Sequence, residues 1–299
     1  MVRLSPDGVL VVDKPVGPTS HDVVGDARRL YGTRAVGHAG TLDPMASGVL
    51  VLLFGEATKL SNYLTLESKR YAARVQLGLS TTTDDAWGDV LEQRSWTEGA
   101  VTHERLEAAL AAERARTAQI PPPVSAIKVA GQRAHKLVRA GQPPELEPRS
   151  VCVHELTLRG VQGAAIDLEA HVSKGYFVRA LARDLGRHLG FPAHLSALRR
   201  IASGSFSIAE AHQWPPAEPL PLLSLASAAR RALPALDLTD EGELRARQGK
   251  RLLAEHFGGG ELTRASEPGA WFAPDGALVA LGQREGDEWV VLRGFVRSD

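Results

Sequence analysis

A glycine-rich segment between two apolar runs constrains this chain more than any other stretch of its sequence. Residues 37–48 read Gly-His-Ala-Gly-Thr-Leu-Asp-Pro-Met-Ala-Ser-Gly, with apolar residues before them at 8–12 and after them at 49–54. Glycine permits a positive φ or a close backbone approach, and Pro44 biases Asp43 towards an extended conformation. The pattern predicts a shaped loop that presents the Asp43 carboxylate between two apolar elements, a common placement for functional groups.

Asp43 has a structural interpretation as well as a functional one. An aspartate in such a loop often bonds its own backbone and serves only the turn. The segment is not a P-loop, because no Gly-Lys-Ser/Thr follows the first glycine at the required spacing. Nor is Ser47 in a nucleophile elbow, which needs a glycine two residues before the serine. Spacing alone therefore leaves both interpretations of Asp43 open.

Hydrophobic periodicity predicts an α+β domain. Strands are expected at 8–12, 49–54, 71–79, 151–158 and 166–172, the last two as a pair. Helices are expected at 21–31, with Thr19 or Ser20 as N-cap, and at 57–64, 103–116, 178–189 and 225–232, with a further β/α segment around 125–139. The regular alternation of a doubly wound sheet is missing, so a mixed sheet is favoured.

The C-terminal tail has a different character. Prolines cluster within 212–221, and short apolar runs at 271–273, 277–281 and 289–296 are separated by turn signals. We therefore expect a small β-barrel-like unit that begins near residue 235.

The net charge of the chain gives no indication of a binding partner, but the charge of one segment does. The chain has 35 basic and 35 acidic residues, but residues 121–200 hold 12 Lys or Arg against 6 Asp or Glu. Such a basic region can bind phosphates by releasing counterions, or it can be an ordinary solvated surface. The charge pattern does not decide between the two.

Cysteine, histidine and apolar content exclude several classes. The single cysteine, Cys152, excludes an internal disulfide and a thiolate-based zinc site, and its apolar neighbours predict a buried core thiol. The ten histidines show no metal-binding spacing, so no metal site is expected. No signal peptide and no run of about 18 apolar residues are present, which favours a cytoplasmic protein without membrane contact.

Five motifs, found in order over roughly residues 8–206, resemble those of the TruB-type tRNA pseudouridine-55 synthases. They are Val-Val-Asp-Lys-Pro-Val-Gly-Pro-Thr-Ser at 11–20, the glycine-rich segment 37–48, Lys-Arg-Tyr at 69–71, Val-Ser-Lys-Gly-Tyr-Phe-Val-Arg at 172–179, and Leu-Arg-Arg at 198–200. The resemblance implies a catalytic domain over 1–232 with a mixed, largely antiparallel sheet and an RNA-gripping insertion at about 120–150. It also implies an RNA-binding PUA domain at 235–299.

The resemblance assigns a catalytic set. Asp43 would be the essential carboxylate, Tyr71 would contact the target base, and Arg179 would pair with Asp43. Each has a plainer alternative: Tyr71 as a half-buried strand tyrosine, and Arg179 as a solvated helix arginine, since Arg183 and Arg187 follow at intervals of four.

Further residues are implied at the base pocket and in RNA binding. His38 would occupy or prop open the vacated base stack, unless it is a satisfied loop histidine. Lys14 and Pro15 would buttress the catalytic loop or contact RNA. The remaining assignments are Leu198 and Phe177 at the base pocket, Asp85 near it, and Lys128 in the RNA-gripping insertion, where a solvated helix is the alternative.

The chain departs from the family pattern at several positions. Val124 and His135 stand where the family usually has tyrosine, and Thr82 stands for an aspartate, although Asp85 is present. Phe177 also replaces a frequent tyrosine, which keeps the ring but removes a hydroxyl. These changes put the details of base contact and RNA affinity in doubt, while the catalytic set stays complete.

The implied reaction breaks the N1–C1′ bond of uridine 55 in the T-loop of tRNA and rejoins the ring through C5, with no cofactor or metal. The base must first leave its stack, which costs a few kcal/mol. Asp43 would attack C1′, attack C6 or abstract a sugar proton. The expected partner is the T-arm of tRNA, bound by a monomer without guide RNA, since the long segment 87–149 resembles insertions of stand-alone members.

Two other classes compete with this reading. One is an RNA-binding or tRNA-folding protein without catalysis, although a pure binder has no need of a carboxylate in its groove. The other is a carboxylate glycosidase, which would require a second acid near Asp43.

Overall fold

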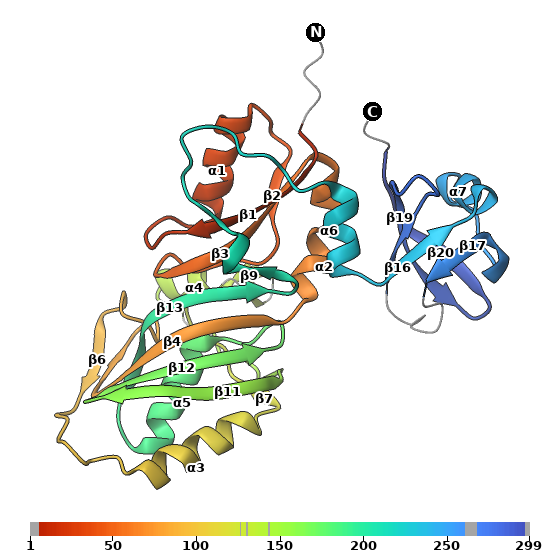
Figure 1. Cartoon of the computed structure of the whole chain (residues 1–299). Coiled ribbons are helices and arrows are strands. Elements are labelled where there is room, and N and C mark those ends of the chain that lie inside the picture. The colour runs from red at the N-terminus through yellow and green to blue at the C-terminus, as the bar shows by residue number, and fades with distance from the viewer. Residues whose placement is uncertain (1–5, 126, 130, 143, 261–267, 297–299) are drawn as a thin grey trace.

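The larger part of the molecule is built on one twisted sheet (Figure 1). The structure, a computed structural model, describes residues 6–125, 127–129, 131–142, 144–260 and 268–296. The main path of the sheet is β11-β12-β4-β13-β3-β1-β15, with β14 beside β13 and β2 beside β3. Its strands are β1 (Gly8–Lys14), β2 (Val36–His38), β3 (Ala46–Phe54), β4 (Lys69–Leu77), β11 (Val153–Gln162), β12 (Ala165–Val172), β13 (Ala193–Ser203), β14 (Phe206–Ser207) and β15 (His212–Gln213).

Most strand pairs in this sheet are antiparallel. The parallel pairs are β13 with β3 and β1 with β15. The mixed, largely antiparallel sheet expected from the sequence is therefore confirmed, as is the pairing of the two strands expected at 151–158 and 166–172.

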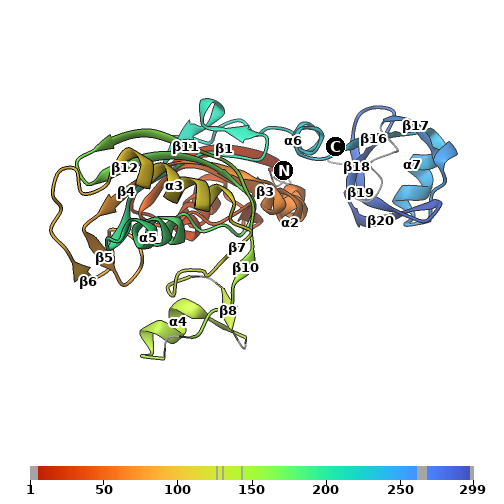
Figure 2. The same cartoon turned by 90° about the horizontal axis from the view of Figure 1, so that it is seen from below.

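Helices α3 (His103–Arg114) and α5 (Val178–Leu189) cover one face of the β11–β13 half of the sheet (Figure 2). Along β12 every second residue is buried beneath them, as the two-residue period of a strand requires. Helix α5 is buried along most of its length against β13 and α3, and it stops at Gly190, which has φ 76°. Burial of this face stabilises the pairing register, because a slip of one residue would turn the apolar side chains outward.

Helix α1 (Ser20–Tyr31) packs on the other half of the sheet. Val23, Val24 and Ala27 are buried against β1, β2 and β3. Thr19 accepts from the Asp22 N–H, and the Asp22 carboxylate accepts from the Thr19 N–H, a reciprocal capping box. The N-cap expected at Thr19 is confirmed.

The helical segment expected at 57–64 is confirmed, but it is divided into two helices. A 3₁₀ helix, η1 (Gly55–Leu60), is followed by helix α2 (Ser61–Leu66). Ala57 and Leu60 are both fully buried. A 3₁₀ turn places residues three apart in line, so it buries both of these side chains on one side.

Several short elements stand off the main sheet. Strands β5 (Leu79–Thr81) and β6 (Val90–Gln93) pair with each other, as do β7 (Ala118–Gln119) and β10 (Arg149–Ser150). Between β7 and β10 the chain forms β8 (Lys128–Val129), β9 (Gln132–Arg133) and α4 (Ala134–Arg139), which project away from the sheet in Figure 2. The β/α segment expected around 125–139 is present.

A 3₁₀ helix, η2 (Ile208–Glu210), lies between β14 and β15; after β15 the chain passes through helix α6 (Leu225–Ala232) into a second, smaller sheet. Its strand order is β17-β16-β18-β19-β20. The elements are β16 (Ala235–Leu238), α7 (Asp240–Arg247), η3 (Ala254–His256), β17 (Phe257–Gly260), β18 (Gly269–Phe272), β19 (Leu278–Glu285) and β20 (Glu288–Gly294). The three strands expected in the tail correspond to β18, β19 and β20, whereas β16 and β17 were not expected.

The smaller sheet packs against α6 and η1. Phe272 and Leu281 share a buried cluster with Val9 and Val51 of the main sheet. The Arg230 guanidinium of α6 lies 3.8 Å from the centre of the Phe272 ring, an attractive cation–π contact. The two sheets therefore have a common apolar interface.

The expectation of a buried thiol at Cys152 is wrong. Cys152 is exposed and precedes β11, an edge strand of the sheet, and its N–H donates to Ser173 Oγ at 2.8 Å. The apolar neighbours Val151 and Val153 misled the prediction, because the core reaches only one side of an edge segment and Val151 takes that side.

Gly48, at the parallel junction of β3 with β13, has no space for a side chain. Its φ is +105°, and an added Cβ would lie 2.2 Å from the Arg200 carbonyl oxygen. We expect Gly48→Ala to lower the free energy of unfolding by about 3 kcal/mol or more, measured by urea denaturation. Gly17→Ala is the matched control, because Gly17 has a φ of +118° with nothing within 4 Å. Equal losses in both variants would show that φ, and not the close approach, makes Gly48 necessary.

Candidate active site

The loop that carries Asp43 is anchored at both ends. Leu42 exchanges two hydrogen bonds with the Ser20 hydroxyl of α1: its N–H donates to Oγ at 2.8 Å and its carbonyl accepts from Oγ at 3.0 Å. Beyond Asp43, the Pro44 carbonyl accepts from the Gly17 N–H at 2.9 Å. The Ala46 N–H donates to the Asp43 carbonyl at 3.0 Å, which closes a turn around Pro44. The aspartate therefore lies on a fixed turn.

A buried arginine holds the first part of this loop. Arg200 of β13 is 1% exposed, and it donates to the carbonyls of Gly40, Thr41 and Val49 at 2.7–3.1 Å. Gly40 has a φ of +91°, and the loop turns there. A guanidinium can satisfy three carbonyls at once because it has five N–H donors in one plane.

Lys14 supports the same region from beneath. It is fully buried, and its ammonium donates to the carbonyls of Pro15 and Pro18 at 2.8 and 2.9 Å. Burial and the Arg200 charge lower the pKa of Lys14 to about 8, against the opposing effect of Asp43. Pro15 itself is exposed. Of the two roles expected for Lys14, support of the loop is the one that these contacts favour.

Asp43 forms an ion pair with Arg179. Arg179 Nε lies 3.0 Å from Asp43 Oδ2, and the arginine side chain is 7% exposed while that of Asp43 is 37% exposed. The second contact of Arg179 is with Asp85, whose Oδ2 lies 3.7 Å from Nη1. Nη1 also donates to the carbonyls of Thr83 and Val124 at 3.0 and 2.9 Å. Arg179 is thus a shared centre between the catalytic loop and two other segments.

A turn between β5 and β6 positions Asp85 behind Arg179. Asp84 adopts the left-handed conformation with φ 58°, an uncommon one for a residue other than glycine. Asp85 Oδ1 then accepts from the Thr83 hydroxyl at 2.7 Å and from the Trp87 N–H at 3.0 Å. Asp84 pairs with Arg183 at 3.1 Å, while burial raises the pKa of its carboxyl. Asp85 therefore contacts the arginine and does not line the cavity.

The first turn of α5 is fixed by Gln119 of β7. The Gln119 side chain accepts from the Phe177 N–H at 2.9 Å and donates to the Phe177 carbonyl at 3.2 Å. Beside it, the Tyr176 hydroxyl donates to Glu113 Oε1 at 2.6 Å in the core, and burial raises the pKa of Tyr176 well above its usual value. Tyr176 is therefore a structural residue, although it lies within the fourth sequence motif.

Asp43 and Arg179 face a cavity of about 670 Å³. Its walls include Tyr71 of β4, Leu198 of β13 and Phe177 before α5. Five of the residues predicted for the site, Asp43, Tyr71, Phe177, Arg179 and Leu198, thus surround one space. Lys69, Arg149, Lys174 and Arg200 also line it and were not predicted as site residues. Lys69 and Arg200 both belong to the sequence motifs, but the motifs do not indicate that these two side chains are buried.

Lys14, Pro15, His38 and Asp85, which were also predicted for the site, are not among the residues that line this cavity. His38 of β2 packs edge-on against His21, with ring centres 5.5 Å apart. Burial, and then the charges of His21 and Arg200, lower the pKa of His38 to about 4. Lys128 belongs to β8, and its side chain lies outside the described atoms. Within the described residues, no three His, Cys, Asp or Glu side chains gather as metal ligands would.

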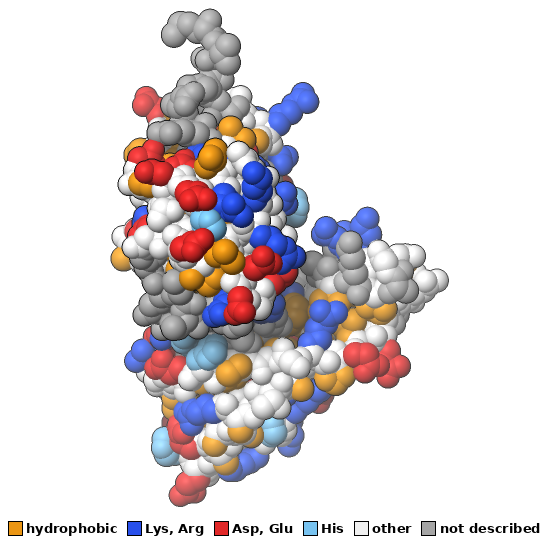
Figure 3. All heavy atoms as spheres, turned by 90° about the vertical axis from the view of Figure 1, so that its right-hand side faces the viewer, with side chains coloured by type: hydrophobic (Ala, Val, Ile, Leu, Met, Phe, Trp, Pro, Cys, Tyr) orange, Lys and Arg blue, Asp and Glu red, His pale blue; other side chains and the backbone are white. Residues whose placement is uncertain are grey.

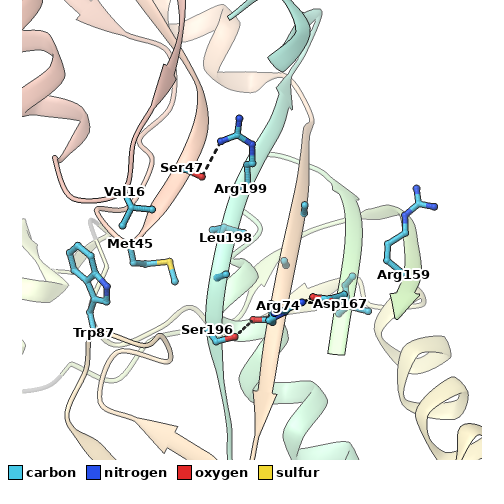
Figure 4. A pocket seen from close by; sticks show the side chains of 14 residues that line it. Val16, Met45, Ser47, Arg74, Trp87, Arg159, Asp167, Ser196, Leu198 and Arg199 are labelled. Atoms are coloured by element: carbon cyan, nitrogen blue, oxygen red, sulfur yellow. Dashed lines mark hydrogen bonds and ion pairs between the residues drawn. The ribbon is translucent and has the colours of Figure 1, made fainter. Parts of the chain in front are cut away.

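A second cavity, of about 630 Å³, adjoins the end of the same loop at Met45 and Ser47 (Figure 4). Val16, Met45 and Trp87 border it on one side, and Ser47, Ser196 and Arg199 lie opposite. Its arginines are paired: Arg74 with Asp167, Arg159 with Glu169 and Arg199 with Asp13. The arginines of this cavity are balanced by carboxylates and Asp43 does not line it, so the first cavity is the candidate active site.

Two sequence profiles of known families match the chain. The profile described as "TruB family pseudouridylate synthase (N terminal domain)" matches residues 28–178. The profile described as "tRNA pseudouridylate synthase B C-terminal domain" matches residues 179–215. The class of protein that the fold and these profiles define is a pseudouridylate synthase.

Relatives and solved structures agree with this class. The chain is 46% identical over 282 residues to the tRNA pseudouridine synthase B of Arthrobacter sp. (strain FB24), with 92% of each chain covered. It is 45% identical over 289 residues to that of Thermobifida fusca (strain YX), covering 93% of this chain and 94% of the relative. The chain belongs to the TruB family.

The fold is shared with more distant proteins. A chain in the "Structure of H/ACA RNP bound to a substrate RNA containing 2'-deoxyuridine" matches with a TM-score of 0.71 at 22% identity, covering 97% of this chain and 85% of that one. A chain in a Cbf5-Nop10-Gar1 complex gives a TM-score of 0.70 at 23% identity, covering 97% and 84%. These matches extend the similarity in fold over the smaller C-terminal sheet as well.

Arg179 compensates a buried carboxylate. We expect Arg179→Met to lower the free energy of unfolding by about 3–5 kcal/mol, because Asp85 then stays buried without a positive partner. Combining it with Asp85→Asn should recover part of this loss, and urea denaturation of the three variants measures the coupling. Arg187→Met is the control, since the Arg187 side chain is 70% exposed and its pairing with Asp184 contributes about 1 kcal/mol or less. Strict additivity of the two substitutions would contradict the pairing.

His38 should make folding sensitive to acid. Its pKa in the folded protein is about 4, below its usual 6.5, so the unfolded chain binds a proton first as the pH falls. The stability that this group contributes is complete above pH 6.5 and is lost as the pH falls towards 4. We expect the difference in unfolding free energy between the wild type and His38→Asn to shrink by about 2 kcal/mol between pH 7 and pH 4. His188→Asn, at an exposed histidine, should show no such change; a constant difference for His38→Asn would refute the effect.

Proposed function

We propose that this protein isomerises uridine 55 in the T-loop of tRNA to pseudouridine, with Asp43 as the catalytic carboxylate. The observation that carries the proposal is the Asp43–Arg179 pair, set on a fixed turn that faces an aromatic-lined cavity. The tRNA substrate follows from the relatives named tRNA pseudouridine synthase B, which match over more than nine-tenths of this chain.

A uridine in this cavity has suitable neighbours on every side. The rings of Tyr71 and Phe177 offer stacking surfaces that offset the cost of unstacking the base. Leu198 adds an apolar contact. A cavity of about 670 Å³ is large enough for one flipped nucleotide.

Asp43 acts from a defined orientation. Its Oδ2 is held by Arg179, and within the described residues no hydrogen bond to Oδ1 is recorded, so Oδ1 is the oxygen that meets the substrate. The N1–C1′ bond breaks, the uracil turns, and a C5–C1′ bond forms; the proton on C5 then leaves and N1 gains one. Attack of Asp43 on C1′, attack on C6, and removal of a sugar proton all begin from this oxygen. Tyr71, on the wall of the same cavity, is the group we assign to proton transfer at C5.

The remaining parts of the proposal concern RNA binding and the setting of the reaction. The described parts of the segment 120–150, which include α4 and β8, project from the sheet in Figure 2 and would grip the T-arm, with Lys128 among them. The sheet over residues 235–299 would act as a PUA-like RNA-binding unit. His38 would fill the base stack that the uridine leaves. We propose a monomer that needs no guide RNA, cofactor or metal and works in the cytoplasm; no helix in the described residues is long and apolar enough to cross a membrane.

The decisive experiment uses a tRNA transcript labelled with tritium at C5 of uridine. Wild-type protein should release tritium, and Asp43→Asn should release it at least about 100-fold more slowly. Asp43→Glu, which keeps the charge but moves it, is the matched control for loss of position. Replacing uridine 55 by cytidine should remove the product. Equal release by Asp43→Asn, or no release by folded wild type from intact tRNA, would overturn the proposal and favour an RNA-binding protein.

A further inference from the structure

The active-site cavity contains far more positive than negative charge. Among the described residues that line it, Asp43 is the one acid, while five are basic: Lys69, Arg149, Lys174, Arg179 and Arg200. The arginines that line the second cavity are each paired with a carboxylate. On the face seen in Figure 3, acidic and basic side chains are interspersed, in keeping with a formal net charge of +0. The lining of the cavity is therefore more basic than the face seen in Figure 3.

The basic residues lie at two depths. Arg149 and Lys174 are exposed at the rim, where ordinary RNA contacts are expected. Lys69 and Arg200 lie on the floor and are only 7% and 1% exposed. Burying a cation costs several kcal/mol unless an anion or several hydrogen bonds compensate it. The burial of the two cations on the floor of the cavity is therefore the feature to be explained.

Both floor residues come from the face of the sheet that carries Tyr71. Lys69 is two residues before Tyr71 on β4, and Arg200 lies directly opposite Tyr71 on β13. Their side chains converge on Gly40: a Cβ built there would lie 3.8 Å from both Arg200 Nη1 and Lys69 Cε. Two buried cations thus lie next to each other at the start of the catalytic loop.

The hydrogen bonds of Lys69 and Arg200 to backbone carbonyls do not use all of their N–H donors. Lys69 donates to the carbonyls of Thr65 and Glu67, which occupies two of its three N–H groups. Arg200 donates to three carbonyls, which leaves one N–H on each terminal nitrogen. Burial, and then the Arg200 charge, lower the pKa of Lys69 to about 8, against the opposing effect of Glu67. An anion at this point would relieve the repulsion and accept the remaining donors.

We propose that Lys69 and Arg200 form a phosphate-binding subsite on the floor of the cavity, which takes a backbone phosphate adjoining the nucleotide whose base faces Asp43. This inference rests on the proposed function. A phosphate diester suits the site because it offers two unesterified oxygens to donors that converge from two strands. Once bound there, it would fix the ribose between the floor and Asp43, so the subsite contributes to positioning the glycosidic bond.

The experiment neutralises one phosphate at a time. A T-arm stem-loop RNA is made with a single methylphosphonate linkage on the 5′ or on the 3′ side of the target uridine, and Kd, KM and the single-turnover rate are measured. With wild-type protein we expect one of the two linkages to weaken binding by about tenfold or more. The Lys69→Met variant should bind the all-phosphate RNA about tenfold more weakly than the wild type does, and the neutral linkage should weaken its binding little further. The Lys69→Arg variant keeps the positive charge and should bind the all-phosphate RNA more tightly than Lys69→Met does. Arg74→Met, on the same strand but on the opposite face, is the matched control and should bind as wild type does.

Several outcomes overturn the subsite. If neither neutral linkage weakens binding to the wild type, no buried phosphate contact exists. This measurement uses the wild-type protein alone, so it does not depend on whether a variant folds. If the losses from Lys69→Met and from the neutral linkage simply add, Lys69 does not contact that phosphate. If inorganic phosphate competes with RNA at Lys69 while neither neutral linkage matters, the site takes a free anion instead. Failure of the wild type to form pseudouridine at all would refute the proposed function, and the binding data would still be read separately.

Discussion

The ion pair between Arg179 and Asp43 is the contact on which the geometry of the candidate active site depends. It joins the loop after α1 to the first turn of α5, although 136 positions separate the two residues along the chain. The same guanidinium contacts Asp85 and the carbonyls of Thr83 and Val124, so the β5–β6 turn and the segment after β7 are fixed to it as well. Loss of this one side chain would leave a carboxylate buried and free the segments that surround the cavity.

Arg200 plays a matching part beneath the loop. It lies where β13 runs parallel to β3 for a short stretch, and it supplies donors to carbonyls that the turning loop cannot pair within a sheet. A buried carbonyl without a partner is costly, so an irregular loop inside a core needs such donors. Gly48 allows the backbone of Arg200 to approach closely enough for this arrangement. The shape of the catalytic loop is therefore a property of the sheet junction.

Much of the site could be predicted from the sequence. The motifs indicated Asp43, Tyr71, Phe177, Arg179 and Leu198, and the structure places all five around one cavity. Helices α1 and α5 were predicted nearly to the residue; Thr19 caps the start of α1, and a glycine in the left-handed conformation ends each helix. Lys69 and Arg200 were missed as site residues, since nothing local distinguishes a buried cation from a solvated one. Cys152 was misplaced for a related reason: the pattern of its neighbours cannot reveal that its strand lies at an edge.

The sequence by itself determined which residues carry chemistry and which local elements hold them, because turn glycines, caps and apolar periodicity act over a few residues. The tertiary structure decided what those residues face. Asp85 became a partner of Arg179 behind the cavity, His38 packed against His21, and two lysines and an arginine were buried close together around the catalytic loop. Charge and burial depend on contacts between strands that are distant in sequence, and for that reason only the assembled sheet reveals a cavity floor suited to an anion.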